Sequence, residues 1–414
     1  MSTDLDISPV ALRRAMVAGI KDAGYPLSRD VEQALLAVER HAFVPGASLA
    51  EAYAAAIVVT KRGPGGEVLS CLSAPSIVAL QLQQLDVRPG HRVLEIGAGT
   101  GYNAALLGHL VGPGGHVTTI DVDADIVDDA RRRLAAARVG NVEVVLGDGA
   151  LGSQGGAQFD RIVATVGAYD IPQSWLSQLA PGGRLVVPLR IRGSITRSIA
   201  FERDEAGGWR SADHQLCGFV PLRDGAADDP RRTISLTADE TVTLQLHQEH
   251  DGNTAWLAEI FDQPRTAAWT GVTFGPMESV EWLYLWLACT EPGGLCRMAT
   301  AATAVESGQV APMFNWGAMA VAADDALAYL TWRAAEGARD RRELAEVGII
   351  GHGPGASTLV DQINERISLW EKHFRQSTVT IEIPADRAGS SDPAEGQFFL
   401  DRTHNPVAVR WVEA

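Results

Sequence analysis

The sequence lacks several features that would place a protein in a specialised class. It has only four cysteines in 414 residues, scattered with no Cys-x-x-Cys pair, so neither a disulfide framework nor a metal site is expected. No apolar run approaches the roughly 20 residues of a membrane span. The first residues are acidic, where a secretory signal would be basic. These absences predict a cytoplasmic globular protein with no membrane partner.

The sequence is also short of positive charge. Its 35 lysines and arginines are outnumbered by 51 aspartates and glutamates, which gives a net charge of −16. Residues 1–210 carry −2 and residues 211–414 carry −14. A strongly acidic half repels phosphate backbones, so no nucleic acid is expected as a partner. The acidic half either keeps the chain soluble or attracts a basic peptide, and the sequence leaves both readings open.

Apolar strand patterns alternate with helical patterns between residues 92 and 188. Strands are predicted at 92–96, 116–122, 142–146, 159–165 and 184–188, with helices at 103–111, 124–137 and 173–179. Further helices are predicted upstream at 9–23, 30–40 and 76–85. This alternation predicts an α/β fold, a doubly wound Rossmann-like parallel sheet.

After about residue 212 the pattern becomes mixed. A strand pair is predicted at 233–247, helices at 279–289 and 357–376, strands at 378–383 and 407–412, and a mobile loop at 224–232. We therefore predict two domains, residues 1–212 and an α+β domain at 213–414.

A glycine-rich loop follows the first strand of the alternating region. Residues 93–103 read VLEIGAGTGYN, and glycines allow the tight turn and let a ligand approach bare backbone. The third glycine comes four positions after the first, whereas a dinucleotide fingerprint places it five positions on. The pattern suits an amino-acid carboxylate and ammonium better than a pyrophosphate. An NAD-dependent dehydrogenase remains the alternative.

Polar residues at the ends of the next strands complete a predicted cofactor site. Asp121 can accept hydrogen bonds from ribose hydroxyls, and Asp148 can receive an adenine amino group between two glycines. We therefore predict a methyltransferase domain that binds S-adenosyl-L-methionine and releases S-adenosyl-L-homocysteine. The predicted cofactor-binding residues are Glu95, Gly97, Ala98, Gly99, Thr100, Gly101, Asn103, Asp121, Val122, Gly147, Asp148, Gly149 and Thr165.

Residues 31–191 resemble protein-L-isoaspartate O-methyltransferase. The matching pieces, in order, are Ala42-Phe43-Val44-Pro45, Leu72-Ser73-Ala74-Pro75, VLEIGAGTGY, Gly147-Asp148-Gly149, Asp160-Arg161-Ile162 and Pro181-Gly182-Gly183. In this family the serine of the Ser-x-Pro element lies beside the substrate carboxylate. The resemblance therefore implies that Ser73 is the catalytic-site residue, that Ser73 and Ala74 contact substrate, and that the N-terminal helical segment lies on the substrate side.

The chain departs from the repair enzymes in two places. It has Thr165–Asp170 where they have an alanine-rich segment, and it continues for about 200 residues beyond their usual end. Both features are similar to aspartyl O-methyltransferases of ribosomal peptide pathways, of the FxLD, lanthipeptide and graspetide types. The resemblance implies further substrate residues, Val166, Gly167, Ala168 and Tyr169, and a peptide-recognition role for residues 213–414.

The implied reaction is methylation of an aspartate carboxylate in a modified precursor peptide, leading to an aspartimide and then to isoaspartate. An aspartate with a pKa of about 3.9 is already ionised at neutral pH, so no general base is needed. Repair of isoaspartyl proteins is the alternative reaction. A peptide-binding scaffold with a relic cofactor fold is the alternative of another class. The oligomeric state stays open.

Overall fold

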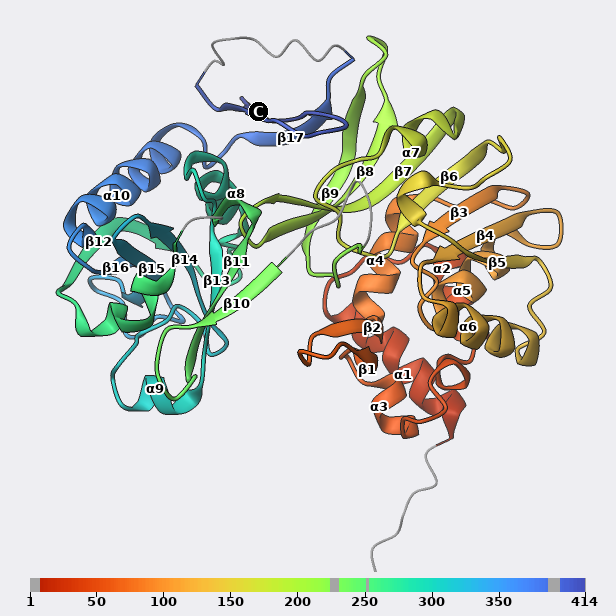
Figure 1. Cartoon of the computed structure of the whole chain (residues 1–414), viewed down its shortest axis with the longest axis horizontal. Coiled ribbons are helices and arrows are strands. Elements are labelled where there is room, and N and C mark those ends of the chain that lie inside the picture. The colour runs from red at the N-terminus through yellow and green to blue at the C-terminus, as the bar shows by residue number, and fades with distance from the viewer. Residues whose placement is uncertain (1–7, 224–230, 251–252, 386–394, 414) are drawn as a thin grey trace, which may run out of the picture.

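The computed structural model describes residues 8–223, 231–250, 253–385 and 395–413. Two β-sheets dominate them, one with ten strands and one with seven, and a short hairpin forms a third sheet (Figure 1). The part of the predicted loop at 224–230 lies outside the described residues. None of the helices within the described ranges is long and apolar enough to cross a membrane.

Five parallel strands form the centre of the methyltransferase fold. They are β3 (Arg92–Ile96), β4 (His116–Asp121), β5 (Val142–Leu146), β6 (Phe159–Ala164) and the first part of β7 (Leu179–Arg192), in the order β5-β4-β3-β6-β7. Helices α5 (Tyr102–Val111), α6 (Ala124–Ala136) and α7 (Gln173–Ser177) connect them, with the short helix η2 (Gly149–Leu151) after β5. The predicted doubly wound α/β fold is confirmed.

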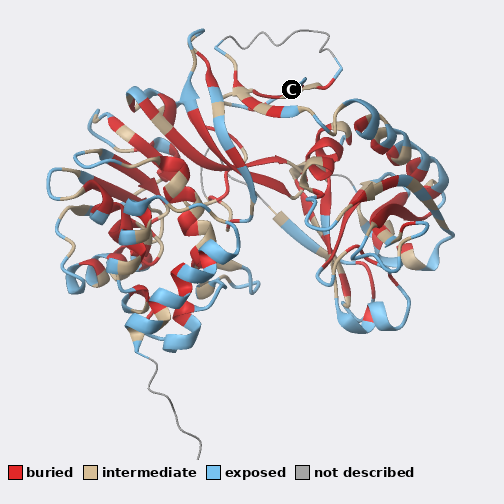
Figure 2. Ribbon diagram, turned by 180° about the vertical axis from the view of Figure 1, so that it is seen from behind, coloured by how far each residue is buried: buried red, intermediate tan, exposed pale blue. Residues whose placement is uncertain are grey.

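Both faces of this sheet are buried. Successive strand residues point to opposite faces, and each face is covered by other elements. Val93 packs with one group of helices: α1 (Pro9–Asp22), α2 (Arg29–Ala37), α4 (Pro75–Leu85), α5 and α6. Leu94, the next residue, joins a core on the other face that includes Trp175 of α7. Figure 2 shows the resulting band of buried residues along the central strands.

The segment between α2 and α4 combines short helices with a hairpin. It contains the short helices η1 (Arg40–Phe43) and α3 (Leu49–Tyr53), then the antiparallel hairpin β1 (Val58–Arg62) and β2 (Val68–Leu72). Ser28 caps α2, and Ser48 with Glu51 forms a capping box at α3. These caps satisfy backbone donors at the helix ends, so the segment that leads into Ser73 is well defined.

The chain leaves the ten-stranded sheet and later returns to it. Antiparallel strands β8 (Ile195–Arg203) and β9 (Trp209–Cys217) follow β7, and β17 (Thr378–Ile383) pairs with β9. β19 (Val407–Val412) and β18 (Gln397–Leu400) complete the edge. The predicted boundary between residues 212 and 213 falls inside β9, and a cut there would separate the first part of β9 from β17, one of its two strand partners. The ten-stranded sheet contains strands from both sides of the predicted boundary, so the two predicted domains do not correspond to the two sheets.

The seven-stranded sheet is antiparallel and lies between β9 and β17 in the sequence. Its order is β10 (Arg231–Ser235), β11 (Val242–His247), β13 (Cys296–Thr300), β14 (Gly317–Ala323), β15 (Ala326–Ala334), β16 (Ala345–His352) and β12 (Arg265–Phe274). Helices α8 (Glu281–Thr290), α9 (Ala302–Glu306) and α10 (Ala356–His373) and the short helices η3 (Gln248–His250) and η4 (Ala255–Asp262) accompany it. The predicted strand pair at 233–247 is confirmed by the pairing of β10 with β11.

The two sheets share one hydrophobic core. Leu94 and Phe201 of the large sheet belong to the same buried cluster as Trp286 of α8, Trp370 of α10 and Leu330 of β15. The turn between β7 and β8 also reaches the second sheet, where the Ser194 N–H donates to the Leu295 carbonyl at 2.6 Å. The halves are therefore packed into one body, and the space between them has defined walls.

Candidate active site

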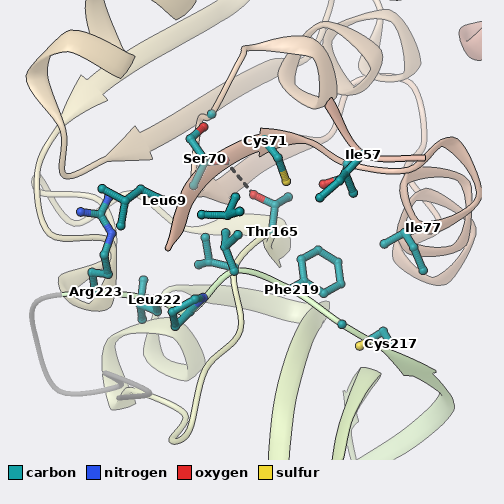
Figure 3. A pocket seen from close by; sticks show the side chains of 18 of the residues that line it. Ile57, Leu69, Ser70, Cys71, Ile77, Thr165, Cys217, Phe219, Leu222 and Arg223 are labelled. Atoms are coloured by element: carbon teal, nitrogen blue, oxygen red, sulfur yellow. Dashed lines mark hydrogen bonds between the residues drawn. The ribbon is translucent and has the colours of Figure 1, made fainter. Parts of the chain in front are cut away.

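A cavity of about 880 Å³ opens between the two sheets. Its walls come from the glycine loop and the ends of β3, β4 and β6, from the β1–β2 hairpin and the start of α4, from residues 217–223, and from the second sheet. Figure 3 shows Ser70, Cys71 and Ile57 on one side and Phe219 and Leu222 on the other, with Thr165 between them. The cavity therefore lies at the carboxyl ends of the parallel strands, where open α/β sheets bind ligands.

The glycine loop has the geometry of a close backbone approach. Gly97 and Gly99 have φ of +99° and +51°, in the region that favours glycine. A Cβ on Gly97 would lie 2.8 Å from Thr165 Oγ1. That hydroxyl donates to the Gly97 carbonyl at 2.7 Å, so Thr165 both lines the cavity and holds the loop.

Gly101 has a different task from the other two glycines. It begins α5 with φ of +84°, and a Cβ there would lie 3.4 Å from Leu134 of α6. It does not line the cavity, whereas Ala98 and Thr100 do. Its role is to let α5 start close to α6.

Asp121 and Asn103 offer acceptors to a ligand in the cavity. Asp121 Oδ2 accepts the Gly99 N–H at 3.0 Å and Oδ1 accepts the Asp123 N–H at 3.2 Å, which leaves a lone pair on each oxygen. Asn103 Nδ2 donates to Glu95, whereas its buried Oδ1 has no hydrogen-bond partner among the described residues. Ribose hydroxyls and an ammonium group are donors that would satisfy these atoms.

Glu95 lies behind the cavity wall and does not line the cavity, and its contact with the cofactor stays a prediction. The side chain is fully buried and accepts hydrogen bonds from Asn103 Nδ2 at 2.8 Å and Thr119 Oγ1 at 2.6 Å. Burial raises the pKa of Glu95 to about 7, partly offset by these two donors. Its position beneath the loop makes Glu95 a positioning residue for Asn103.

The end of β5 contributes one of its three predicted residues to the cavity wall. Gly149 lines the cavity, and a Cβ there would lie 2.4 Å from Ile96. Gly147 and Asp148 lie beside it without lining the cavity, and Asp148 Oδ1 accepts the Ala150 N–H at the start of η2. Val122, after Asp121, does line it.

Ser73 and Ala74 both line the cavity at the start of α4. Ala74 is the N-cap residue and no side chain caps the helix, so the Ser73 hydroxyl is not engaged there. The buried Arg40 guanidinium holds this segment, donating to the Ser73 carbonyl at 2.7 Å and to the Ala52 carbonyl at 2.6 Å. Desolvation lowers the pKa of Arg40. Its positive charge beneath Ser73 favours an anion in the cavity.

The predicted substrate residues after β6 divide into two groups. Val166 lines the cavity, but Gly167, Ala168 and Tyr169 do not. Gly167 exchanges hydrogen bonds with Val220 and Leu222, and Ala168 bridges to β7. These are backbone contacts that hold neighbouring segments together.

Tyr169 packs away from the cavity, between two arginines. The guanidinium carbons of Arg190 and Arg402 lie 4.5 and 3.7 Å from the centre of its ring. The next residue, Asp170, accepts the backbone N–H groups of His404 and Asn405. Residues 169 and 170 therefore contact the C-terminal part of the chain, and substrate contact by residues 167–169 stays a prediction.

Several cavity residues were not predicted from the sequence. Arg223 lines the cavity and pairs with Asp123 at 2.6 Å, and Lys61 of the hairpin, outside the cavity wall, pairs with the same carboxylate at 3.1 Å. The β7–β8 turn, β8, the end of β9 and the segment after it contribute Ser194, Thr196, Cys217 and Phe219 to the wall. The second sheet contributes Arg231, Thr233, Gln245, Arg297 and Met319. No local sequence motif identifies these residues, because they come from segments that are far apart in the chain and meet only in the folded structure.

The fold, the glycine loop, the Asp121 carboxylate and the Asn103 oxygen, which has no partner among the described residues, together fit S-adenosylmethionine. The chain is an S-adenosylmethionine-dependent carboxyl O-methyltransferase. Residues 11–227 match the family model for protein-L-isoaspartate(D-aspartate) O-methyltransferase, and the chain belongs to that family.

Similar proteins carry the same description. The chain is 40% identical over 211 residues to the protein-L-isoaspartate O-methyltransferase of Methanopyrus kandleri, covering 51% of this chain and 90% of that protein. It is 39% identical over 197 residues to protein-L-isoaspartate O-methyltransferase 2 of Archaeoglobus fulgidus, covering 48% and 86%.

Solved structures of the same description also align. A protein-L-isoaspartate O-methyltransferase has 21% identity and a TM-score of 0.48, covering 89% of this chain and 96% of that one. A second, from Plasmodium falciparum in complex with S-adenosyl-L-homocysteine, has 18% identity and a TM-score of 0.45, covering 51% and 98%.

Proposed function

We propose that this enzyme methylates the side-chain carboxylate of an aspartyl residue in a peptide that lies between the two sheets. The supporting observation is the composition of the cavity wall. One side holds the predicted cofactor residues, and the opposite side is built by Arg231, Gln245, Arg297 and their neighbours on the second sheet. The family model ends at residue 227, so most of this wall lies outside the region matched to the family.

The proposed cofactor site uses residues from four places in the fold. Asp121 accepts from the ribose hydroxyls, Asn103 Oδ1 from the ammonium, and the Gly97–Thr100 backbone surrounds the amino-acid part. Gly149 lies where a flat ring can approach, with Asp148 beside it. When bound, S-adenosylmethionine supplies the methyl group as a sulfonium.

The protein's part in the chemistry is alignment and exclusion of water. A carboxylate is already ionised at neutral pH, so no residue needs to remove a proton. Ser73 can donate its hydroxyl hydrogen to one carboxylate oxygen, and buried Arg40 fixes the Ser73 backbone. Aligning the acceptor and stripping its water contribute to the rate by proximity and desolvation.

The finer proposal is a normal aspartate in a ribosomally made, modified precursor peptide. Its methyl ester is a better acyl electrophile than the carboxylate. The backbone nitrogen of the next residue then attacks the ester carbonyl and methanol leaves, closing a five-membered aspartimide whose hydrolysis gives isoaspartate. Support for this substrate comes from the motif resemblance and from the wall of the second sheet.

Repair of isoaspartyl proteins is the second candidate. The relatives that match this chain over 86–90% of their length are named protein-L-isoaspartate O-methyltransferases. The contacts of Tyr169 and Asp170 with the C-terminal part of the chain also weaken one reason for separating this chain from them. Both substrates present a carboxylate beside a peptide backbone, so both are compatible with the cavity.

Matched peptides separate these two substrates. We would incubate the full-length enzyme and S-adenosylmethionine with one peptide made with aspartate and again with isoaspartate at the same position. Short precursor peptides encoded beside the gene would be tested in linear and cyclised form. Methylation of aspartate followed by net loss of water in the mass spectrum would support the precursor proposal. Methylation of isoaspartate alone would establish the repair activity.

Two variants test whether the assignment of the site is right. Asn103→Leu should weaken binding of S-adenosylhomocysteine, and Ser73→Ala should lower methyl transfer while that binding persists. If no peptide is methylated although S-adenosylhomocysteine binds tightly, the proposed reaction is wrong and the scaffold alternative gains.

A further inference from the structure

The second sheet has a polar face toward the cavity. In the antiparallel register Thr233 of β10 pairs with Gln245 of β11, and Arg297 of β13 pairs with Met319 of β14. All four line the cavity. Figure 1 shows β10, β11 and β13 on the side of this sheet nearest the methyltransferase strands.

The other half of the same sheet has a different environment. Leu330 of β15 and Ile349 of β16 belong to the hydrophobic core with α8 and α10. This face of the second sheet is therefore apolar where it packs against α8 and α10 and mostly polar where it lines the cavity. The difference indicates that the polar part contacts a ligand or water and not other parts of the protein.

Arg297 is the residue of this face best placed to bind an anion. Its side chain is exposed and lines the cavity, and no carboxylate of the described residues pairs with it. By contrast, Arg333 on β15 pairs with Glu346 at 2.8 Å. The Arg297 backbone N–H donates to Ser194 Oγ at 3.0 Å, which ties this strand to the β7–β8 turn.

An aromatic platform supports the Arg297 side chain. Its guanidinium carbon lies 5.3 Å from the centre of the Trp316 ring, and Trp316 stacks on Phe314 at 5.5 Å with an angle of 11° between the rings. Trp316 is 40% exposed. Stacking holds a guanidinium in one plane while its N–H groups stay available for bidentate contact with a carboxylate.

The part of the cavity wall that the second sheet builds carries arginines, although the half of the chain that builds it is acidic and Glu67 and Asp121 line the cavity elsewhere. Residues 211–414 carry −14, yet the second sheet presents Arg231 and Arg297 to the cavity. The hypothesis that the acidic half attracts a basic peptide is therefore not supported by this part of the cavity wall. Charge complementarity at the cavity favours an acidic peptide.

We propose that Arg297, held by Trp316, binds a second carboxylate of the substrate peptide, on an acidic side chain that flanks the methylated residue. This inference rests on the proposed function, because it assumes a peptide substrate in the cavity. It assigns Arg297 a role in specificity, since the arginine acts on a neighbouring residue and not on the methyl acceptor.

Peptide libraries test this assignment. Two libraries would carry aspartate or isoaspartate at a fixed centre, with glutamate, glutamine, lysine, alanine or leucine at three positions on each side. Acetylated and amidated ends remove the terminal charges, so any preference for acid comes from side chains. Mass spectrometry of peptides competing for the enzyme gives relative kcat/KM values, and calorimetry with S-adenosylhomocysteine checks each variant's cofactor site.

The wild-type enzyme should prefer glutamate over glutamine at one flanking position by roughly three- to tenfold. Arg297→Gln should remove that preference, and Arg297→Glu should shift it toward lysine. Arg341→Gln is the matched control, because Arg341 also lies over a tryptophan, Trp332, but does not line the cavity. It should leave the preference unchanged.

Three results would overturn the inference. The same flanking preference in wild type and Arg297→Glu would remove Arg297 from substrate recognition. A uniform loss of activity on all peptides in Arg297→Gln would place the arginine at the methyl acceptor instead. Absence of any methylated peptide with wild type, while S-adenosylhomocysteine binds, would refute the proposed function itself and this inference with it.

Discussion

Replacing Glu95 by glutamine tests how the cofactor loop is held. Glu95 is fully buried, and among the described residues its carboxylate has the Thr119 hydroxyl and the Asn103 amide as its donors. Burial raises its pKa from 4.5 to about 7, because two neutral donors do not replace the water that a carboxylate loses. The folded protein therefore keeps a proton on Glu95 at pH values where the unfolded chain has released it.

The pH dependence follows from this difference. A carboxyl with a raised folded-state pKa contributes stability that is fully present below pH 4.5 and is lost as the pH rises through 7. At about 1.4 kcal/mol for each pH unit, the loss between pH 4.5 and pH 8 is about 3 kcal/mol. Glutamine has no proton to release. Glu95→Gln should therefore become more stable relative to wild type by about 3 kcal/mol across this range.

Hydrogen exchange measures this effect locally, without assuming that the whole chain unfolds in one step. Free energies of opening would be obtained for peptides covering β3 and α5 at several pH values, corrected for the intrinsic pH dependence of amide exchange. Glu143→Gln, an exposed glutamate on β5, controls for loss of a surface carboxylate. Parallel pH profiles for wild type and Glu95→Gln would show that Glu95 is ionised in the fold, and the reasoning would fail.

Three further substitutions address other parts of the site. Asp121→Ala should weaken binding of S-adenosylhomocysteine by about 1.5–3 kcal/mol, or roughly 10- to 150-fold. Calorimetry measures this affinity, with Asp128→Ala as the control variant. Equal affinities for Asp121→Ala and Asp128→Ala would show that Asp121 does not contact the cofactor. Gly97→Ala should abolish that binding because its φ is +99° and its Cβ would clash. Gly66→Ala is its control, with φ of +83° but open space around it, and equal binding by both would contradict the crowding argument. Tyr169→Ala should lower the thermal midpoint of unfolding, because an aromatic ring between two guanidinium groups contributes about 2 kcal/mol when desolvated. The same variant should keep the peptide preference of the wild type. A changed preference at unchanged stability would indicate that Tyr169 contacts the substrate.

The central part of the fold, and several residues that line the candidate site, could be predicted from the sequence because their causes are local. Strand residues Val93–Ile96, a loop that needs positive φ, and a helix directly after it follow one another in the chain. Asp121 lies at the end of the next parallel strand, and parallel order brings strand ends to one edge. Ser73 was found by family resemblance, since nothing in its local pattern distinguishes it from a helix cap.

Other features depend on segments that are far apart in the sequence. The local pattern of Glu95 is that of a strand residue beside a glycine loop, and only packing shows that it is fully buried and bonded to Thr119 and Asn103. The partners of Tyr169 are 21 and 233 residues away, at Arg190 and Arg402. The pairing of β17 with β9 likewise joins segments that a contiguous domain boundary would separate.

The class of chemistry can be predicted from a short stretch of sequence, because a ligand held by consecutive backbone groups requires particular consecutive residues. Which side chains face the cavity depends instead on how distant strands pack together. An acidic half of the chain presents arginines to the cavity, because net charge sums over a whole surface whereas binding depends on the few side chains that a particular strand register turns inward.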